Sequence, residues 1–258
     1  MSKSRRTKVH TYNRDSNQWR DHERSLIAEI PLQVMVNGEY LATLNRTPGN
    51  DFFLATGFLY YQGLIDCSED ILTHRLTAAK EELSLSPLTT DTIHFEIRKP
   101  TPNLRPASAA AIWSLINPQA GKKLNPAFVL APRLIAGMPE EMIKEQKLYM
   151  TTAGAHAVAL INRDGRILHC EEDVGRTNAL DKIVGYCITS RIEMNSLGAL
   201  FSGRINLEMA VKIAKAGFSL IFSISAPTAT AVEILQAIGV TYAGSLKGGS
   251  FTLFNGSR

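Results

Sequence analysis

The chain has 258 residues, of which 45% are apolar, so it can bury a core as one large domain or two modest ones. No run of about eighteen apolar residues is present, and no apolar stretch follows the basic N-terminus. We therefore expect no membrane span, no secretory signal and a cytoplasmic protein. The three scattered cysteines are too few for a disulfide framework or a standard zinc cluster, so we expect reduced thiols and no zinc.

The formal net charge of +4 is concentrated at the N-terminus. Residues 1–24 hold seven Lys and Arg against three Asp and Glu, whereas the rest of the chain carries 21 residues of each sign. The body of the protein therefore lacks the excess of basic residues typical of nucleic acid binding, and no nucleic acid partner is expected. A basic, polar tail is typical of a disordered segment, with a docking arm for an acidic partner as the alternative.

The first elements are expected between residues 29 and 65. The segment EIPLQVMVNGEYLATLN alternates on both sides of Asn37-Gly38, a pair that favours a type I′ turn, and so predicts a hairpin. The segment TPGNDFFLATGFLYYQGLI predicts a buried helix that starts near Pro48, with Asn50 as a candidate cap, and ends at Gly63.

The middle of the chain predicts short strands at 71–77 and 92–98, followed by a loop. The three prolines of RKPTPNLRP mark that loop and a domain boundary. The alanine-rich SAAAIWSLI is compatible with a short helix, and Pro139 opens another helix through residue 147.

From residue 150 onward, strand-like and helix-like segments alternate. The expected strands are HAVALIN, GRILHCE, GALFS, FSLIFSIS and VTYAGSL, and the expected helices cover 177–190, 206–216 and 227–238. This alternation predicts βαβ crossovers and a mostly parallel sheet with helices on its faces.

Four junctions in this region are candidates for ligand contact, because backbone N–H groups and helix dipoles at strand ends favour anions. They are 172–178 with Thr177 or Asn178 as a cap, 202–206, 225–228, and 245–250, where positive φ at Gly248 or Gly249 would form an anion-binding nest. Together they suggest a phosphate-bearing ligand. Each also has a structural interpretation, as a helix cap, a hairpin turn or an ion pair on a helix face.

Two histidines have competing interpretations. His156 stands just inside an apolar strand, where a structural role is the alternative to a functional one. His169-Cys170-Glu171 matches half of a zinc deaminase signature, but the P-C-x-x-C half is absent from the sequence. With no second pair of ligands, a metal-dependent nucleotide deaminase or hydrolase built on these residues is the less favoured hypothesis.

Five motifs, in this order and spacing, resemble the formate dehydrogenase accessory (FdhD/NarQ) family. They are TAGAH at 152–156, EEDVGRTNALDKIVG at 171–185, SGR at 202–204, SxSAPTxTAVE at 223–233 and YAGSLKGG at 242–249. The resemblance covers most of the chain, since IPLQVMVNGEY and DFFLATGFLYYQGLI also match the family in character.

The resemblance implies an α/β fold with two parts after the tail (1–24) that composition predicts to be disordered. These are a smaller α+β domain (25–105) and a cytidine-deaminase-like three-layer α/β/α domain without the metal site (106–258). It also implies a homodimer and a sulfur carrier, or sulfurtransferase, that receives sulfur from a cysteine desulfurase. The sulfur would pass to the molybdenum bis(molybdopterin guanine dinucleotide) cofactor before its insertion into formate dehydrogenase.

The resemblance further implies a site for the cofactor's guanine nucleotide. The family's cofactor-contacting segment falls on Ser245, Leu246, Lys247, Gly248, Gly249 and Ser250, and we add Gly175, Arg176, Arg204 and His156 as candidate binding residues. In this interpretation Arg176 and the N–H of Gly175 meet phosphate, and Glu172 or Asp173 accepts from guanine or orients Arg176.

The sequence departs from the family where sulfur is carried. Ser108 and Ala111 stand at the positions of the family's two cysteines, and serine cannot replace a thiolate in sulfur relay. One explanation is that Cys170 takes over, with its pKa lowered by Arg176 and the helix dipole, although a buried structural cysteine is the alternative. Another is a cofactor-binding chaperone without sulfur transfer. A scaffold that docks desulfurase to dehydrogenase is a third possibility. Thr177, where the family usually has histidine, is a second departure.

Overall fold

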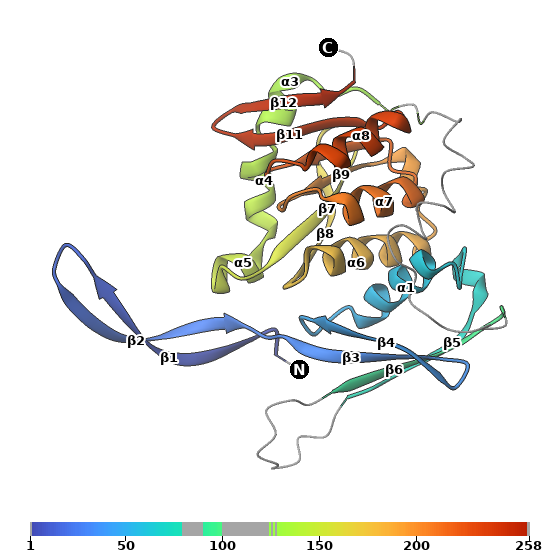
Figure 1. The fold of residues 1–258 in the computed structure, drawn as a ribbon, viewed down its shortest axis with the longest axis horizontal. Helices are drawn as coiled ribbons and strands as arrows, with labels where there is room; N and C mark the ends of the chain where they lie inside the picture. The colour runs from blue at the N-terminus through green and yellow to red at the C-terminus, as the bar shows by residue number, and fades with distance from the viewer. Residues whose placement is uncertain (1, 79–89, 100–123, 125, 127, 257–258) are drawn as a thin grey trace.

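The protein is built on three β-sheets of two, four and six strands, shown in the computed structural model in Figure 1. The structure describes residues 2–78, 90–99, 124, 126 and 128–256. Ser108, Ala111, the alanine-rich segment and most of the proline loop lie outside these residues, so the expectations that concern them stay predictions.

Residues 1–24 were expected to be disordered, and this expectation is wrong. β1 (Ser4–Asn13) and β2 (Gln18–Ile27) form an antiparallel ribbon of ten residue pairs. Nearly all of its side chains are exposed, and in Figure 1 it extends away from the body of the molecule. No apolar alternation marks this segment, because a ribbon with two solvent-facing sides does not need one.

The four-stranded sheet confirms the predicted hairpin and strands. Its order is β4-β3-β6-β5, with β3 (Ile30–Val36), β4 (Glu39–Arg46), β5 (Ile71–Thr77) and β6 (Asp91–Ile97). Asn37 and Gly38 both have positive φ in the turn between β3 and β4, as the Asn-Gly pair requires. The short 3₁₀ turn η1 (Ser68–Asp70) precedes β5.

The helix α1 (Asp51–Gln62) covers one face of this sheet and ends at Gly63 in the left-handed conformation, as predicted. Asn50 stands at the N-cap position as expected, but its side chain makes no bond to the helix and instead donates to both carboxylate oxygens of Glu171, at 2.8 and 2.9 Å. Asn50 therefore ties the beginning of α1 to the larger sheet.

The six-stranded sheet has the order β12-β11-β10-β9-β7-β8. Its strands are β7 (His156–Ile161), β8 (Ile167–Asp173), β9 (Gly198–Phe201), β10 (Leu220–Ser223), β11 (Thr241–Lys247) and β12 (Ser250–Asn255). The prediction of a mostly parallel sheet is wrong, because only the β9·β10 and β10·β11 pairs are parallel, and the other three are antiparallel. The strand segments were predicted, but β12 and the β7–β8 hairpin were not recognised as antiparallel edges.

Helices cover both faces of the six-stranded sheet, which gives three layers. On one face lie α6 (Arg176–Thr189), α7 (Leu207–Ala216) and α8 (Ala229–Ala237), preceded by the 3₁₀ turn η3 (Met194–Ser196). On the other face lie α3 (Pro132–Ala136), α4 (Met138–Glu145) and α5 (Lys147–Thr152). Met138 and Met142 of α4 belong to the hydrophobic core between these helices and the sheet. The mixed α/β architecture is confirmed, while the closer likeness to cytidine deaminase and the domain limits stay predictions.

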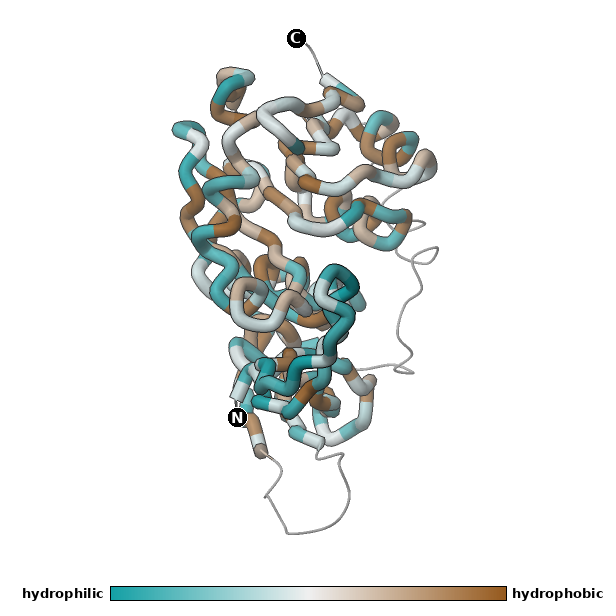
Figure 2. The backbone as a smooth tube through the Cα atoms, turned by 90° about the vertical axis from the view of Figure 1, so that its left-hand side faces the viewer, coloured by the Kyte–Doolittle hydropathy of each residue, from teal (hydrophilic) through white to brown (hydrophobic). Residues whose placement is uncertain are grey.

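The two larger sheets are joined through α1 and α6, whose backbones approach each other closely. A Cβ atom added to Gly185 would lie 1.8 Å from the Phe53 carbonyl oxygen, and one added to Gly57 would lie 2.0 Å from that of Asp181. Only glycine fits these two crossings. In Figure 2 the two parts lie one above the other, with the C-terminus at the top and the N-terminus in the lower part. Within the described residues, no helix combines the length and the hydropathy that crossing a membrane requires.

Candidate functional site

The three predicted junctions at 172–178, 202–206 and 225–228 meet at one edge of the six-stranded sheet. β8, β9 and β10 end there and β7 begins there, since His156 lies opposite Asp173 and Phe201 lies opposite both Val158 and Ser223. The hydroxyl of Ser225 donates to the carbonyl of Ser202 at 3.2 Å. We call this region the strand-end edge.

His156, Gly203 and Arg176 are brought together at this edge from three elements. A Cβ atom on Gly203 would lie 3.2 Å from His156 Nδ1 and 3.8 Å from Arg176 Cβ, so glycine permits the close approach of the two side chains. Burial, followed by the nearby charge of Arg176, lowers the pKa of His156. The imidazole is therefore neutral near pH 7, with one nitrogen to donate and one to accept.

The first turn of α6 differs from the prediction. Gly175 is the cap residue, and neither Thr177 nor Asn178 caps the helix. Asp173 instead accepts from the Gly175 N–H at 2.9 Å and from the Asn178 amide at 3.0 Å. Among the described residues, the half-buried Arg176 has no hydrogen bond or ion-pair partner. Its guanidinium is therefore available to an anion.

The three acids that precede Arg176 serve the fold, which corrects the expectation that Glu172 or Asp173 contacts guanine or orients Arg176. Glu171 accepts from Asn50 and lies 2.9 Å from His169 Nε2. Glu172 accepts from the backbone N–H groups of Leu148 and Tyr149, at 2.7 and 2.8 Å, in the first turn of α5.

Asp173 is completely buried and lies 2.7 Å from the ammonium of the buried Lys182. It also accepts from the Thr47 N–H at 3.2 Å. The charge density of the EEDVGR segment is therefore used mainly to fasten α1, α5 and the β4 end to the larger sheet. Of the charged side chains in this segment, Arg176 is the one that has no partner among the described residues.

The other two helix starts confirm the capping interpretation. Asn206 accepts from the Met209 N–H at the beginning of α7, and Thr228 accepts from the Ala231 N–H at the beginning of α8. Arg204, just before α7, is exposed and has no charged partner among the described residues. It stays a candidate for anion binding beside Arg176.

The predicted cofactor segment 245–250 forms the end of β11 and a hairpin turn. Gly248 and Gly249 both have positive φ, and Ser245 has φ of 56° at a break in the β11–β12 register. Leu246 is buried in the core, whereas Lys247, both glycines and Ser250 are exposed. The backbone of this segment therefore forms the hairpin turn that was one of its two interpretations. Its role in ligand binding stays a prediction.

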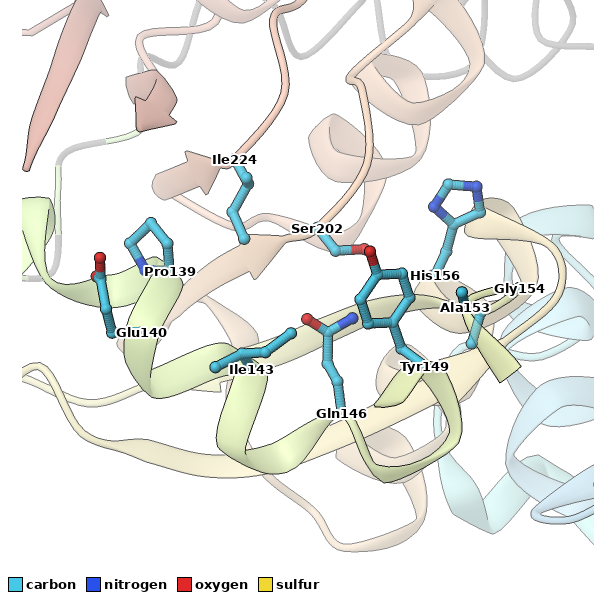
Figure 3. Close-up of a pocket in the computed structure, with 11 residues that line it drawn as sticks. Pro139, Glu140, Ile143, Gln146, Tyr149, Ala153, Gly154, His156, Ser202 and Ile224 are labelled. Carbon is cyan, nitrogen blue, oxygen red and sulfur yellow. The ribbon is translucent and has the colours of Figure 1, made fainter. Parts of the chain in front are cut away.

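A pocket of about 520 Å³ opens at the strand-end edge between α4–α5 and the sheet (Figure 3). Its wall consists of Pro139, Glu140, Ile143, Gln146, Tyr149, Ala153, Gly154, Ala155, His156, Ser202 and Ile224. Of the residues predicted to contact a ligand, His156 and Ser202 lie on this wall. Sequence reasoning missed Gln146 and Tyr149, since a polar residue at a helix junction carries no distinctive signal.

The thiols do not provide an activated nucleophile at this site. Burial, then the charges of Glu172, Glu171 and Glu145, raises the pKa of Cys170 to about 12, so the lowered pKa expected for this residue is contradicted. Burial likewise raises the pKa of Cys187 to about 12. Cys67 is exposed in the loop between α1 and β5, away from the strand-end edge.

The chain that forms this mixed α/β body and its cationic strand-end edge matches the FdhD/NarQ family model over residues 27–258. The chain belongs to this family. It is 36% identical, over 90% of its own length and 89% of the other, to the sulfur carrier protein FdhD of Sulfolobus acidocaldarius. It is 33% identical to the sulfur carrier protein FdhD of Mycolicibacterium paratuberculosis, with 89% of each chain covered.

A solved structure shares the fold. The crystal structure of a formate dehydrogenase accessory protein from Desulfotalea psychrophila superposes with a TM-score of 0.76 at 20% sequence identity, and the match covers 99% of this chain and 98% of the other. The comparison supports the arrangement of sheets and helices described above.

Proposed function

We propose that this protein is a maturation factor of formate dehydrogenase that binds the molybdenum bis(molybdopterin guanine dinucleotide) cofactor as its cargo. The observation that carries the proposal is Arg176, which has no ion-pair partner among the described residues and lies beside the neutral His156 and the small Gly203, next to a pocket of about 520 Å³. A guanidinium without an acid partner binds a phosphate in a bidentate manner. Arg204 adds a second cation at the same edge.

The pocket wall fits a planar, polar group next to that phosphate. Tyr149 offers an aromatic face, while Gln146 and His156 offer donors and acceptors that suit the edge of a base or a pterin. In Figure 3 the Tyr149 ring and the Gln146 amide lie at the same side of the pocket. We therefore assign phosphate recognition to Arg176 and Arg204 and ring recognition to the α4–α5 wall.

Guanosine diphosphate is the probe that tests this assignment on the full chain. Isothermal titration should give saturable binding, and Arg176→Ala should weaken the affinity by about tenfold or more, the loss expected for a charged hydrogen bond of about 1.5–3 kcal/mol. The matched control is Arg163→Ala, an exposed arginine in the turn between β7 and β8 at the other end of these strands. Equal affinities of the two variants would contradict the site.

Sulfur carriage is the activity that the names of the relatives support. In this step a thiolate attacks the terminal sulfur of a desulfurase persulfide, forms a new persulfide, and the desulfurase cysteine leaves as a thiolate. The terminal sulfur would then pass to the molybdenum cofactor before its insertion into the dehydrogenase. The step needs an ionised thiol on this chain.

The raised pKa values favour a second candidate, a cofactor-binding chaperone that does not carry sulfur. With a pKa of about 12, only about one Cys170 side chain in 10⁵ is ionised at pH 7. Incubation with a cysteine desulfurase and cysteine, followed by peptide mass spectrometry, separates the candidates. Added sulfur on a cysteine, lost when that cysteine becomes alanine, supports the carrier. No added sulfur with retained nucleotide binding supports the chaperone.

A further inference from the structure

The β1–β2 ribbon carries the whole net charge of the chain. Residues 1–24 have a formal charge of +4, whereas the rest of the chain carries 21 basic and 21 acidic residues, which cancel. The family match begins at residue 27, so all but the last residue of the ribbon precedes the part of the chain that the family model describes. The expectation of no nucleic acid partner rests on the balanced charge of the body and does not extend to the ribbon.

The two faces of the ribbon differ in charge. Residues opposite each other in the register share a face, and successive residues alternate between the faces. On one face, which we call the compensated face, Lys8 lies opposite Glu23 and His10 contacts Asp21 at 2.6 Å. The other face has no Asp or Glu within the ten residue pairs that the structure describes, and we call it the cationic face. Its arginines are Arg5, Arg20 and Arg24.

These three arginines are available to a partner. They are exposed, and none has an ion-pair partner in the part of the chain that the structure describes. Arg20 and Arg24 stand four residues apart on β2, which separates them by about 13 Å along the ribbon. Arg5 lies on β1, diagonally across from Arg24. Because a guanidinium forms paired hydrogen bonds to phosphate, this row suits a partner that repeats phosphate groups along its length.

The uncharged side chains of the cationic face favour a nucleic acid over an acidic protein surface. The polar ones among them are Thr7, Thr11, Asn13 and Gln18. Hydroxyl and amide groups of this kind donate to phosphate oxygens and pair with the edges of bases. A protein interface, in contrast, has a core rich in aromatic and aliphatic side chains. The aromatic pair of the ribbon, Tyr12 and Trp19, lies on the compensated face.

The dimensions of the ribbon fit the major groove of B-form DNA. Each strand has ten residues, which extend over roughly 33 Å, about one helical turn of the duplex. The two strands lie about 4.8 Å apart, and a major groove about 12 Å wide admits such a two-stranded ribbon. The major groove of duplex RNA is too deep and narrow for side chains to read. Shape therefore favours DNA.

The cationic face is turned away from the body where the ribbon is anchored. The Ala28 N–H donates to the Lys3 carbonyl at 2.9 Å, and a Cβ atom added to Gly154 would lie 2.9 Å from Ile27 Cγ2. Ile27 belongs to the compensated face, so at the base that face is directed to the end of α5 and the cationic face points the opposite way. In Figure 1 the rest of the ribbon extends away from the sheets. A duplex that approaches the cationic face therefore meets the ribbon first.

We propose that the β1–β2 ribbon binds double-stranded DNA, with its cationic face in the major groove and with Arg5, Arg20 and Arg24 on phosphates and base edges. This activity goes beyond the proposed function and does not depend on it, because the ribbon contributes no residue to the strand-end edge or to the pocket of Figure 3.

Fluorescence anisotropy tests the proposal on the full chain. A labelled DNA duplex of mixed sequence and about 20 base pairs should bind saturably at about 50 mM salt, and the logarithm of the association constant should fall with that of the salt concentration with a slope of about −3, from three arginines at about 0.9 each. Duplex RNA of the same sequence should bind at least about tenfold more weakly. Absence of DNA binding, equal affinity for the two duplexes, or displacement by polyglutamate as effective as by unlabelled DNA would overturn the proposal.

A matched pair of variants assigns the binding to one face. Arg20→Gln with Arg24→Gln should weaken DNA binding by at least about tenfold and make the salt slope shallower by about two. The control, Arg6→Gln with Lys8→Gln, removes two exposed cations from the compensated face and should weaken binding by less than about threefold. Circular dichroism checks that both variants keep the fold.

Equal losses of affinity in the two double variants would contradict the cationic face as the binding surface. No guanosine nucleotide is present in these titrations. Failure of the DNA proposal would therefore leave the proposed cofactor site intact, and failure of nucleotide binding would leave the ribbon's affinity for DNA intact.

Discussion

The joint between the two larger sheets and the strand-end edge are both rich in charge, but they use it differently. At the joint, Lys182 is paired with Asp173 and Lys212 with Asp181, all of them buried. At the edge, Arg176 and Arg204 have no acid partner in the described chain. Both regions come from charged segments that look alike in sequence. What distinguishes the structural cluster from the ligand site is whether its charged side chains form ion pairs, and not how many charges it holds.

The buried triad below α1 should show the largest effect of breaking a paired cluster. Arg46 is fully buried and donates to Asp51 at 2.8 Å and to Asp91. Arg46→Met leaves two buried carboxylates without their cation and should lower the free energy of unfolding by about 3–5 kcal/mol. Urea denaturation followed by circular dichroism measures this loss.

The control for this prediction is Lys99→Met, which breaks the exposed pair with Asp66. An exposed ion pair contributes at most about 1 kcal/mol. Equal losses in the two variants would show that burial does not distinguish these clusters.

The next largest effect concerns thiol reactivity at pH 7.5. Because its pKa is raised to about 12 from 9.0, Cys170 should have about 10³-fold less thiolate than an ordinary cysteine. A more basic thiolate is also more nucleophilic, which offsets part of the rate lost through the smaller thiolate fraction. Alkylation should therefore be about thirtyfold slower than for the same cysteine in urea. Iodoacetamide labelling with peptide mass spectrometry measures both rates.

Glu172→Gln provides the internal comparison, because the Glu172 charge is the second cause of the raised pKa after burial. Cys170 should react faster in this variant. If Cys170 of the folded wild-type chain is alkylated as fast as it is in urea, its thiol is not deactivated by the fold, and the hypothesis that Cys170 carries sulfur is supported again.

The smallest effect on stability is expected for Asn206, a residue of the strand-end edge that could either cap α7 or contact a ligand. Asn206 accepts from the Met209 N–H, so Asn206→Ala should cost about 1 kcal/mol of stability. Nucleotide affinity should stay unchanged, because the side chain faces the helix and not the pocket. A loss of affinity without a loss of stability would move Asn206 from the capping class to the ligand site.

The sequence allowed the elements to be predicted better than their arrangement. Asn37-Gly38, Gly63 and the apolar runs of β7 to β11 act through local conformation and burial, which the sequence records directly. Strand direction depends on pairing between distant segments, and so the antiparallel edges β8 and β12 were missed. The ribbon was missed because its exposed side chains show no apolar periodicity.

The candidate site was predicted in part for the same reason. Gly203 and Arg176 come just after predicted strands, so the sequence places them at the strand ends. Gln146 and Tyr149 reach the pocket only through the packing of α4 and α5. The roles of Glu171 and Glu172 depend on Asn50 and on the α5 backbone, partners that lie 23 to 121 residues away in sequence. No local pattern identifies such partners.

A hydrogen-exchange footprint tests the central claim, that Arg176 and Arg204, which have no acid partner within the described residues, bind a phosphate-bearing ligand at the strand-end edge. Amide exchange of the full chain would be measured by mass spectrometry with and without guanosine diphosphate. The expected result is slower amide exchange at 174–178 and 202–206 in the presence of the nucleotide. Exchange around Lys182 and Lys212 in the joint should be the same with and without it. Protection confined to the joint, or no protection at nucleotide concentrations that saturate binding, would contradict the account.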